Sequence, residues 1–123
     1  MKMNALMMVV GFAGLVGCGG TIADVTGRQV DAVNAVANAT CDRYQACGEI
    51  ASGKKYATYD TCKTDEASNW NGRWPTADCD KRINGANLDI CLNAVKSTSC
   101  TNIIDQINTA YNKCAKADVC KGE

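Results

Sequence analysis

The sequence contains no histidine, one proline and one phenylalanine among its 123 residues. Without histidine, neither a Ser-His-Asp nor a Cys-His catalytic arrangement can form. Thirteen Lys and Arg residues balance thirteen Asp and Glu residues, so the formal net charge is zero. A balanced charge leaves no broad basic face, and we therefore expect no nucleic-acid partner. The length accommodates one small domain.

A hydrophobic run long enough to cross a membrane is also missing. The run from Ala5 to Val16 follows the positive Lys2 and has only twelve residues, whereas a spanning helix needs about twenty. Such a run is typical of a secretory signal. It ends in Leu15-Val16-Gly17-Cys18, which resembles the lipobox of bacterial lipoproteins. The resemblance implies a signal peptide at 1–17, cleavage before Cys18 and lipidation of Cys18 with diacylglyceryl and acyl (palmitate-type) chains.

The expected anchor places the chain at the cell envelope. Two or three acyl chains hold a protein stably on a lipid bilayer where one chain does not. Residues 18–26 would then form a lipid-anchored tether. Gly19 stands where an Asp resembles an inner-membrane retention signal, so the outer membrane is favoured over the inner membrane.

Cysteine is the residue in excess, with nine copies. Assigning Cys18 to lipid leaves an even number, and the oxidising compartment outside the inner membrane favours pairing. No C-x-x-C occurs, so the spacing argues against a metal site and we expect no metal or cofactor. The predicted disulfide cysteines are Cys41, Cys47, Cys62, Cys79, Cys91, Cys100, Cys114 and Cys120.

Helix geometry restricts the disulfide pairing. Cys47 is expected to end one helix and Cys62 to open the next, which makes Cys47–Cys62 the leading local pair. Cys100 and Cys114 would lie about 20 Å apart at the two ends of one helix, which excludes their pairing. Cys91–Cys100 is disfavoured for a similar reason.

The apolar residues repeat with helical spacing almost throughout, and no stretch alternates with period two for long enough to indicate a sheet. We therefore predict an all-α fold, a small disulfide-stapled bundle of about four helices, over residues 27–123. Thr26 and Asn87 are the expected N-caps, and Gly48 suits a helix end. The expected helices cover about residues 27–47, 59–70, 88–95 and 101–114. The first and last seams comprise Val30, Val33, Ala37, Thr40, Tyr44 and Cys47, and Ile103, Ile104, Ile107, Tyr111 and Cys114.

Catalysis would have to depend on carboxylates alone. Asp78 and Asp80 are the closest pair, but on a helix they point about 200° apart, so we interpret them as solvated charges. The oxygen-bearing residues around Gly85 do not match the calcium loop of an EF-hand. We expect no catalytic residues and no enzymatic activity.

Two further groups favour structural roles over binding. Trp70 and Trp74 are candidates for a sugar-stacking platform, but we favour their packing in the core, with the indole N–H bound to a carbonyl. Lys54 and Lys55, beside Tyr56 and Tyr59, would contact a polyanion or lipid phosphates only weakly, and a solvated loop is the favoured interpretation.

Much of the mature sequence resembles a known group of proteins. The resemblance lies in Cys41-Asp42-Arg43-Tyr44, Cys47-Gly48-Glu49-Ile50, Gly53-Lys54-Lys55-Tyr56, Tyr59, Cys62, Cys91-Leu92-Asn93-Ala94-Val95, Cys100, Cys114 and Cys120. These residues resemble an uncharacterised family of small cysteine-rich lipoproteins from predatory, fruiting soil bacteria (myxobacteria). Some members are associated with natural-product biosynthesis gene clusters.

The expected function is a non-enzymatic binding or scaffolding module, held at the cell envelope through Cys18, with an unidentified envelope protein or small molecule as its partner. The alternative, which the resemblance implies, is an accessory lipoprotein for biosynthesis, export or self-protection of a natural product.

Overall fold

The computed structural model describes residues 27–122. The predicted signal peptide, the tether, Cys18 and Thr26 lie outside the described residues. Within residues 27–122 the structure is helical, with no strand beyond an isolated bridge between Ile50 and Tyr56. The prediction of an all-α fold is confirmed. None of the helices in this part of the chain has the length and apolar character that a membrane span requires.

Within residues 27–122, four longer helices carry the fold and two short ones complete it, so the expected number of major helices is confirmed. A 3-10 turn, η1, extends α7. The elements are α3 (Gln29–Ala46), α4 (Tyr59–Arg73), α5 (Thr76–Cys79), α6 (Gly85–Lys96), α7 (Ile103–Ala110), η1 (Tyr111–Cys114) and α8 (Lys116–Val119).

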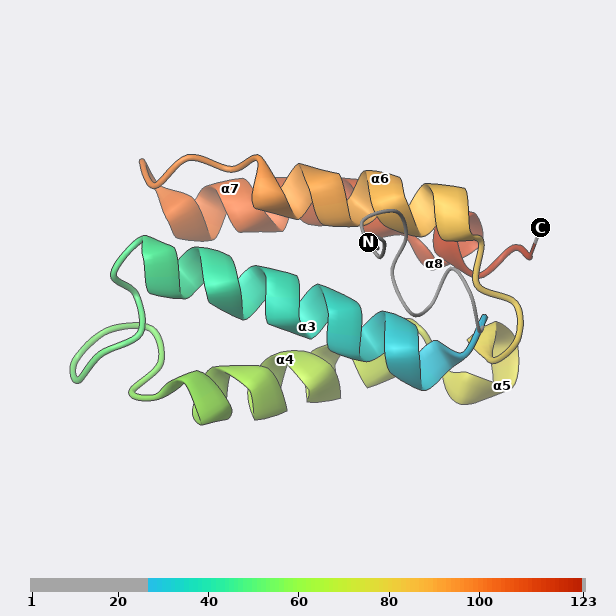
Figure 1. Cartoon of the computed structure of the whole chain (residues 1–123), viewed down its shortest axis with the longest axis horizontal. Helices are drawn as coiled ribbons and strands as arrows, with labels where there is room; N and C mark the ends of the chain where they lie inside the picture. Colours follow the sequence, from blue (N-terminus) through green and yellow to red (C-terminus); the bar gives the residue numbers. More distant parts are fainter. Residues whose placement is uncertain (1–26, 123) are drawn as a thin grey trace, which may run out of the picture.

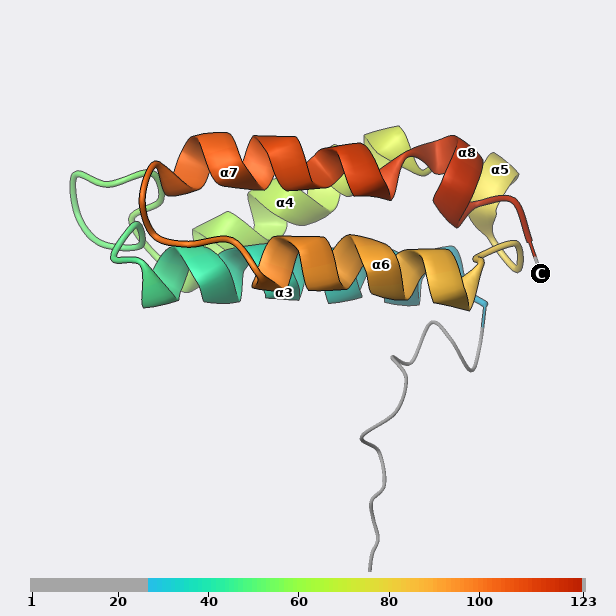
Figure 2. The same ribbon diagram turned by 90° about the horizontal axis from the view of Figure 1, so that it is seen from above.

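The four longer helices run side by side along the long axis of the molecule (Figure 1). Helix α3 packs against α4 and α6, and α6 packs against α7 and η1. The view from above shows α7 and η1 running along α6, with α4 crossing beneath them (Figure 2). Three sides of the bundle therefore have close helix packing. Side chains rather than backbones bridge the fourth side, between α4 and the α7–η1 segment.

The helix ends follow from local hydrogen bonds. Thr58 Oγ1 accepts from Thr61 N at 3.1 Å, and Asn84 Oδ1 accepts from Asn87 N at 2.9 Å, so each begins its helix as an N-cap. The prediction of Asn87 as the N-cap is wrong. The N-cap is Asn84, three residues earlier, whose side chain accepts from the backbone N–H of Asn87. Gly48 adopts φ +78°, the left-handed conformation expected after a helix end.

The N-terminus of α3 is capped from outside its own segment. Arg28 occupies the N-cap position and makes no side-chain cap. Instead, Asp80 Oδ1 accepts a 3.1 Å hydrogen bond from the backbone N–H of Gln29. The carboxylate also lies at the positive end of the helix dipole, which is favourable. Asp80 therefore caps α3 from 51 positions away in the sequence.

The last helical segment differs from the prediction in its final turn. An uninterrupted α-helix was expected over about 101–114, but α7 covers Ile103–Ala110 and tightens into the 3-10 turn η1. Tyr111 and Cys114 are both buried in this turn and tied to other elements, by hydrogen bonds and by a disulfide. These long-range contacts set the geometry of the turn, and the local spacing of apolar residues does not reveal them.

The predicted seams are largely buried. Val33, Ala37, Thr40 and Tyr44 are core residues of α3, as expected. Val30 and Ile104 are exceptions, with 42% and 39% of their surfaces exposed. Val30 lies in the first turn of α3. On α7, the neighbouring Ile103 is buried instead of Ile104.

All eight cysteines of the described residues form four disulfides: Cys41–Cys62, Cys47–Cys100, Cys79–Cys120 and Cys91–Cys114. Cys100 and Cys114 are unpaired with each other, as helix length requires. The predicted pair Cys47–Cys62 is wrong. Six residues of helix place Cys41 and Cys47 about 9 Å apart along the axis and on different faces. Cys41 therefore faces α4, while Cys47 reaches the loop between α6 and α7.

Candidate functional site

The bridged fourth side of the bundle holds a polar cavity of about 420 Å³, which we call the α4–α7 cleft. The lining residues that belong to α4 recur at three- and four-residue spacing, which places them along one face of the helix. The other walls come from α3, from the loop before α4, and from α7 and η1. The lining comprises Tyr44, Lys55, Tyr56, Asp65, Glu66, Ser68, Asn69, Arg73, Asn108 and Tyr111.

Glu66 is the centre of the cleft and only 6% of its surface is exposed. Tyr111 Oη donates to Glu66 Oε1 at 2.9 Å. Tyr56 Oη lies 2.9 Å from Glu66 Oε2 and 2.8 Å from Asp65 Oδ2, so its one proton is shared between two carboxylates. Each oxygen of the buried carboxylate therefore has a hydroxyl partner, as burial of such a group requires.

A third hydroxyl extends this network into α3. Thr40 Oγ1 lies 3.1 Å from Tyr111 Oη, and both groups are buried. Because Tyr111 gives its own proton to Glu66, the Thr40 hydroxyl acts as the donor to Tyr111. The network thus connects α3, the loop before α4, α4 and η1 through side chains alone.

The tyrosines of the cleft hold their protons strongly. Burial raises the pKa of Tyr44 and Tyr111 well above the ordinary value of 10.0, and the nearby Glu66 charge raises both further. Burial also raises the pKa of Tyr56, with added contributions from its hydrogen bonds to Asp65 and Glu66. These hydroxyls consequently stay protonated near neutral pH and are poorly suited to serve as nucleophiles or bases.

Two cations lie in the cleft against aromatic rings. Lys55 Nζ is 5.3 Å from the Tyr56 ring centre and 5.7 Å from that of Tyr44. Arg73 Cζ is 4.9 Å from the Trp70 ring centre and 5.2 Å from that of Tyr111. Among residues 27–122, neither cation has a carboxylate within ion-pair distance. Both retain N–H donors for an anionic group, since cation–π contact uses the ring-facing side.

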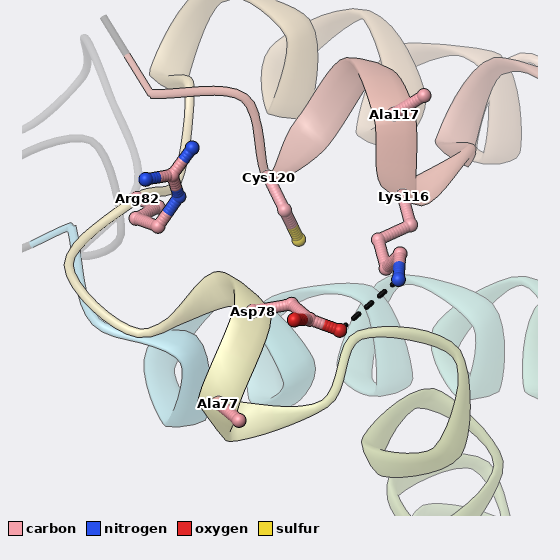
Figure 3. Close-up of a pocket in the computed structure, with 6 residues that line it drawn as sticks. All are labelled: Ala77, Asp78, Arg82, Lys116, Ala117 and Cys120. Atoms are coloured by element: carbon pink, nitrogen blue, oxygen red, sulfur yellow. Dashed lines mark hydrogen bonds and ion pairs between the residues drawn. The ribbon is translucent and has the colours of Figure 1, made fainter.

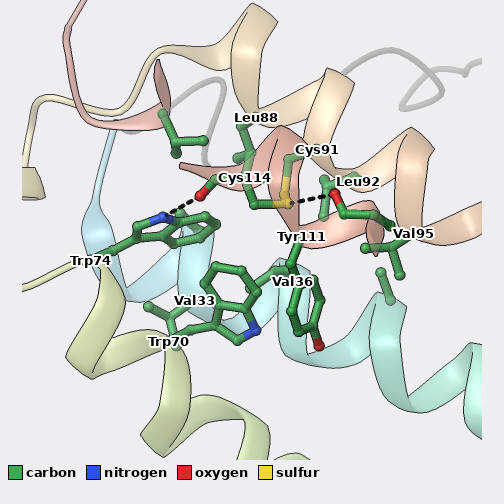
Figure 4. Close-up of a cluster of buried hydrophobic side chains, with 14 of the residues drawn as sticks. Val33, Val36, Trp70, Trp74, Leu88, Cys91, Leu92, Val95, Tyr111 and Cys114 are labelled. Atoms are coloured by element: carbon green, nitrogen blue, oxygen red, sulfur yellow. Dashed lines mark hydrogen bonds between the residues drawn. A yellow bond between two sulfur atoms is a disulfide. The ribbon is translucent and has the colours of Figure 1, made fainter. Parts of the chain in front are cut away.

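Trp70 and Trp74 are fully buried, so the packing interpretation is confirmed and the sugar platform is not formed. Their ring centres lie 4.5 Å apart, and Trp70 meets Tyr111 edge to face at 4.7 Å (Figure 4). Trp74 Nε1 donates to the carbonyl oxygen of Cys114 at 2.9 Å. Trp70 Nε1 is buried without a hydrogen-bond partner in the described part of the chain. Trp70 packs against Tyr111 and Arg73, two residues that line the cleft.

Asp78 and Asp80 do not share a site. Asp78 forms an exposed 3.0 Å ion pair with Lys116 at the rim of a shallow pocket beside Cys120 (Figure 3). Asp80 caps α3 through Gln29 N. Arg82 also lines this pocket, but it forms no ion pair with Asp78 (Figure 3). Among residues 27–122, no group of three metal-ligating side chains is close enough to hold a metal ion.

The two lysines of the predicted solvated loop differ in surroundings. Lys54 and Lys55 are both exposed, but Lys55 alone lies over Tyr rings and lines the cleft. Tyr59 belongs to a separate contact, in which its hydroxyl donates to Asp42 Oδ1 at 2.7 Å. The two lysines are thus solvated, as expected, but Tyr56 of the same loop is buried, so the interpretation as a solvated loop is wrong for that residue. Lys55 and Tyr56 are both part of the candidate site.

Sequence reasoning did not single out Glu66, Arg73 or the role of Tyr111. One signal for Glu66 was present in the sequence. Cys62, Glu66 and Trp70 recur every four residues on α4, so a carboxylate lies on the same helix face as two core residues. A charged residue on a buried face requires partners, and here the tyrosines supply them.

The described chain is therefore a small all-α domain, stapled by four disulfides, with a polar cleft around a buried glutamate. A family model of unknown function, DUF6184, matches residues 41–122. The chain belongs to this family, and the matched region contains all eight paired cysteines and the whole cleft. No curated protein and no solved structure matches the chain.

Proposed function

We propose that this protein is a non-enzymatic, lipid-anchored binding module of the cell envelope that holds a small polar ligand with an anionic group in the α4–α7 cleft. The observation that carries the proposal is the pair Lys55 and Arg73. Both cations line a cavity of about 420 Å³ and have no carboxylate partner among residues 27–122. Asp65, Asn69 and Asn108 add acceptors and donors for hydroxyl or amino groups of the same ligand.

The anchor is supported by the sequence. Leu15-Val16-Gly17-Cys18 follows an apolar run of the length typical of a signal peptide. Only ten residues, 19–28, separate Cys18 from the start of α3, a span of at most about 35 Å. A domain acylated at Cys18 would work close to the bilayer, with the outer membrane as the proposed destination.

The available side chains support a non-enzymatic role. The sequence has no histidine, and each cysteine of the described residues is in a disulfide. The carboxylate of Glu66 is covered by two tyrosine hydroxyls that keep their protons. The cleft therefore offers hydrogen bonds and charge but no activated nucleophile.

The alternative proposal is that the ligand is a natural product, and the protein assists its biosynthesis, export or self-protection. The resemblance to lipoproteins associated with biosynthesis gene clusters favours it. Deletion of the gene with metabolite profiling separates the two proposals. Loss of one secondary metabolite supports the accessory role, and an unchanged profile leaves the general binding module.

The anchor is tested by metabolic labelling with palmitate and by detergent-phase partitioning. The wild-type protein is expected to incorporate label and enter the detergent phase, and Cys18→Ala is expected to lose both. Gly19→Asp keeps the acceptor cysteine, so it should retain label while shifting the protein towards the inner membrane. Equal labelling of wild type and Cys18→Ala would refute the anchor.

The cleft is tested by calorimetric titration of the full-length protein in detergent with a panel of free amino acids and 2-hydroxy acids. A member of the panel is expected to bind, and Arg73→Gln should weaken its affinity about tenfold or more through loss of a charge-assisted bond. Lys63→Gln is the matched control, because Lys63 lies on α4 outside the cleft. No binding by any member, or equal losses in both variants, would refute this ligand class.

A further inference from the structure

The disulfide Cys47–Cys100 differs from the other three in its exposure. Each of the six cysteines in the other three disulfides is buried, with at most 6% of its surface exposed. Cys47 is half-buried and Cys100 is exposed, in the loop between α6 and α7. This loop turns beside the C-terminal end of α3 (Figures 1 and 2). Cys100 is therefore the sulfur that an external thiol reaches first.

A guanidinium group lies against both sulfurs of this disulfide. Arg43 Nη2 is 3.7 Å from Cys47 Sγ and 3.8 Å from Cys100 Sγ. The same nitrogen donates to the carbonyl oxygen of Thr98 at 2.6 Å, which holds the group in place. An arginine stays charged at any physiological pH and favours a thiolate beside it. It also offsets the unfavourable C-terminal end of the α3 dipole, where Cys47 lies.

The loop that carries Cys100 is held independently of the disulfide. The Gln106 side chain accepts from Ser99 N at 2.9 Å. It also donates to Ser99 Oγ at 2.6 Å and to the carbonyl oxygen of Thr101 at 2.5 Å. These bonds flank Cys100 on both sides. The loop therefore keeps Cys100 close to Cys47 when the disulfide opens, and the Cys47 thiolate can attack Cys100 Sγ of a mixed disulfide, expel the external thiolate and restore the bond.

A cavity of about 440 Å³ adjoins Cys100 and gives an attacking thiol a place to dock. Its walls carry the carboxylates of Glu49 and Asp105 and the side chains of Ile103 and Ile104. Glu49, Asp105 and Arg43 together give a net charge of minus one around the path by which a thiol would reach Cys100. An uncharged or cationic thiol is therefore better suited to this cavity than an anionic one.

We propose that Cys47–Cys100 is a thiol–disulfide exchange site for uncharged or cationic thiols, while the other three disulfides are structural. The external thiolate attacks Cys100 Sγ, a new S–S bond forms there, and the Cys47–Cys100 bond breaks with Cys47 leaving as a thiolate beside Arg43. Attack by a second thiolate on the mixed disulfide releases the oxidised thiol and the Cys100 thiolate. Two external thiols are oxidised and one protein disulfide is reduced.

The experiment follows exchange in the full-length protein in detergent with cysteamine, 2-mercaptoethanol or 2-mercaptoethanesulfonate as the probe. Samples are quenched by alkylation and mapped by mass spectrometry, and rates are expressed per thiolate. Cys47 and Cys100 are expected to react at least about tenfold faster than the other six cysteines, with the mixed disulfide on Cys100. The cationic probe should react about threefold or more faster than the anionic one.

Variants separate exchange from general unfolding. Arg43→Gln should slow release of Cys47, and Arg43→Lys, which keeps a charge, should restore part of the rate. The double variant Glu49→Gln with Asp105→Asn should remove the preference among the probes without slowing 2-mercaptoethanol. Equal reactivity of the four disulfides, a mixed disulfide on another cysteine, or fastest reaction with the anionic probe would overturn the proposal.

Discussion

The indole N–H of Trp74 donates a 2.9 Å hydrogen bond to the carbonyl oxygen of Cys114, although 40 residues separate the two. The bond ties the C-terminal end of α4 to η1, on the side of the bundle where helix backbones do not pack closely. Cys114 is in turn joined to Cys91 on α6. One indole and one disulfide thus connect α4, η1 and α6.

The two tryptophans provide a matched pair for testing this bond. Trp74→Phe replaces the indole with a smaller ring and leaves the Cys114 carbonyl without its N–H donor. Trp70→Phe removes a similar volume but takes away an N–H that has no partner within residues 27–122. We expect Trp74→Phe to lower the free energy of unfolding by about 1 kcal/mol more than Trp70→Phe. Denaturant titration measures both, and a larger loss for Trp70→Phe would contradict the assignment.

Asp80 and Asp78 provide a second comparison, because both are exposed carboxylates in the same segment. Asp80→Ala removes the cap of α3 and should cost about 1 kcal/mol of unfolding free energy. Asp78→Ala breaks an ion pair whose side chains are 53% and 50% exposed, and should cost no more than about 0.5 kcal/mol. Thermal unfolding compares the two. Equal losses would show that Asp80 does not act as a cap.

The buried network around Glu66 is tested with tyrosine-to-phenylalanine changes. Tyr111→Phe removes the donor to Glu66 Oε1 and the acceptor for Thr40. We expect a loss of about 1–3 kcal/mol in unfolding free energy, because a buried carboxylate oxygen loses its partner. Tyr59→Phe is the control, since its bond to Asp42 is exposed, and its cost should stay within about 0.5 kcal/mol. A loss of the same size in both variants would argue against a special role for the buried network.

The raised tyrosine pKa values predict a loss of stability in alkali. Burial, and then the Asp42 hydrogen bond and charge, raise the pKa of Tyr59 to about 12. The pKa values of Tyr44, Tyr56 and Tyr111 are raised further. Below pH 10.0, the ordinary tyrosine value, folded and unfolded chains hold the same tyrosine protons, and this stabilisation is fully present. Above it the unfolded chain loses them first, so stability falls as pH rises through the folded pKa values.

Tyrosinate absorbance and chemical denaturation at a series of pH values test this expectation. The native protein should show little ionisation at pH 10, whereas the reduced, unfolded chain should be about half ionised there. Unfolding free energy should decline from pH 10 upward. Ordinary titration of all four tyrosines in the native state would show that the network does not hold their protons.

The sequence by itself determined the helical class, the main helices and the even set of paired cysteines, because these depend on local periodicity and on a count. Helix α6 begins three residues earlier than predicted because Asn84 caps it through a local hydrogen bond to Asn87 N. The 3-10 turn at Tyr111 was missed because long-range contacts outweigh local preference there. Cys47 pairs with Cys100 rather than Cys62 because Cys41 on α3 and Cys47, directly after this helix, face different neighbours. The same holds for the site. Glu66, Tyr56 and Tyr111 become a site only when α4 and η1 are brought together, since a buried charge is stable only among partners that the tertiary structure supplies.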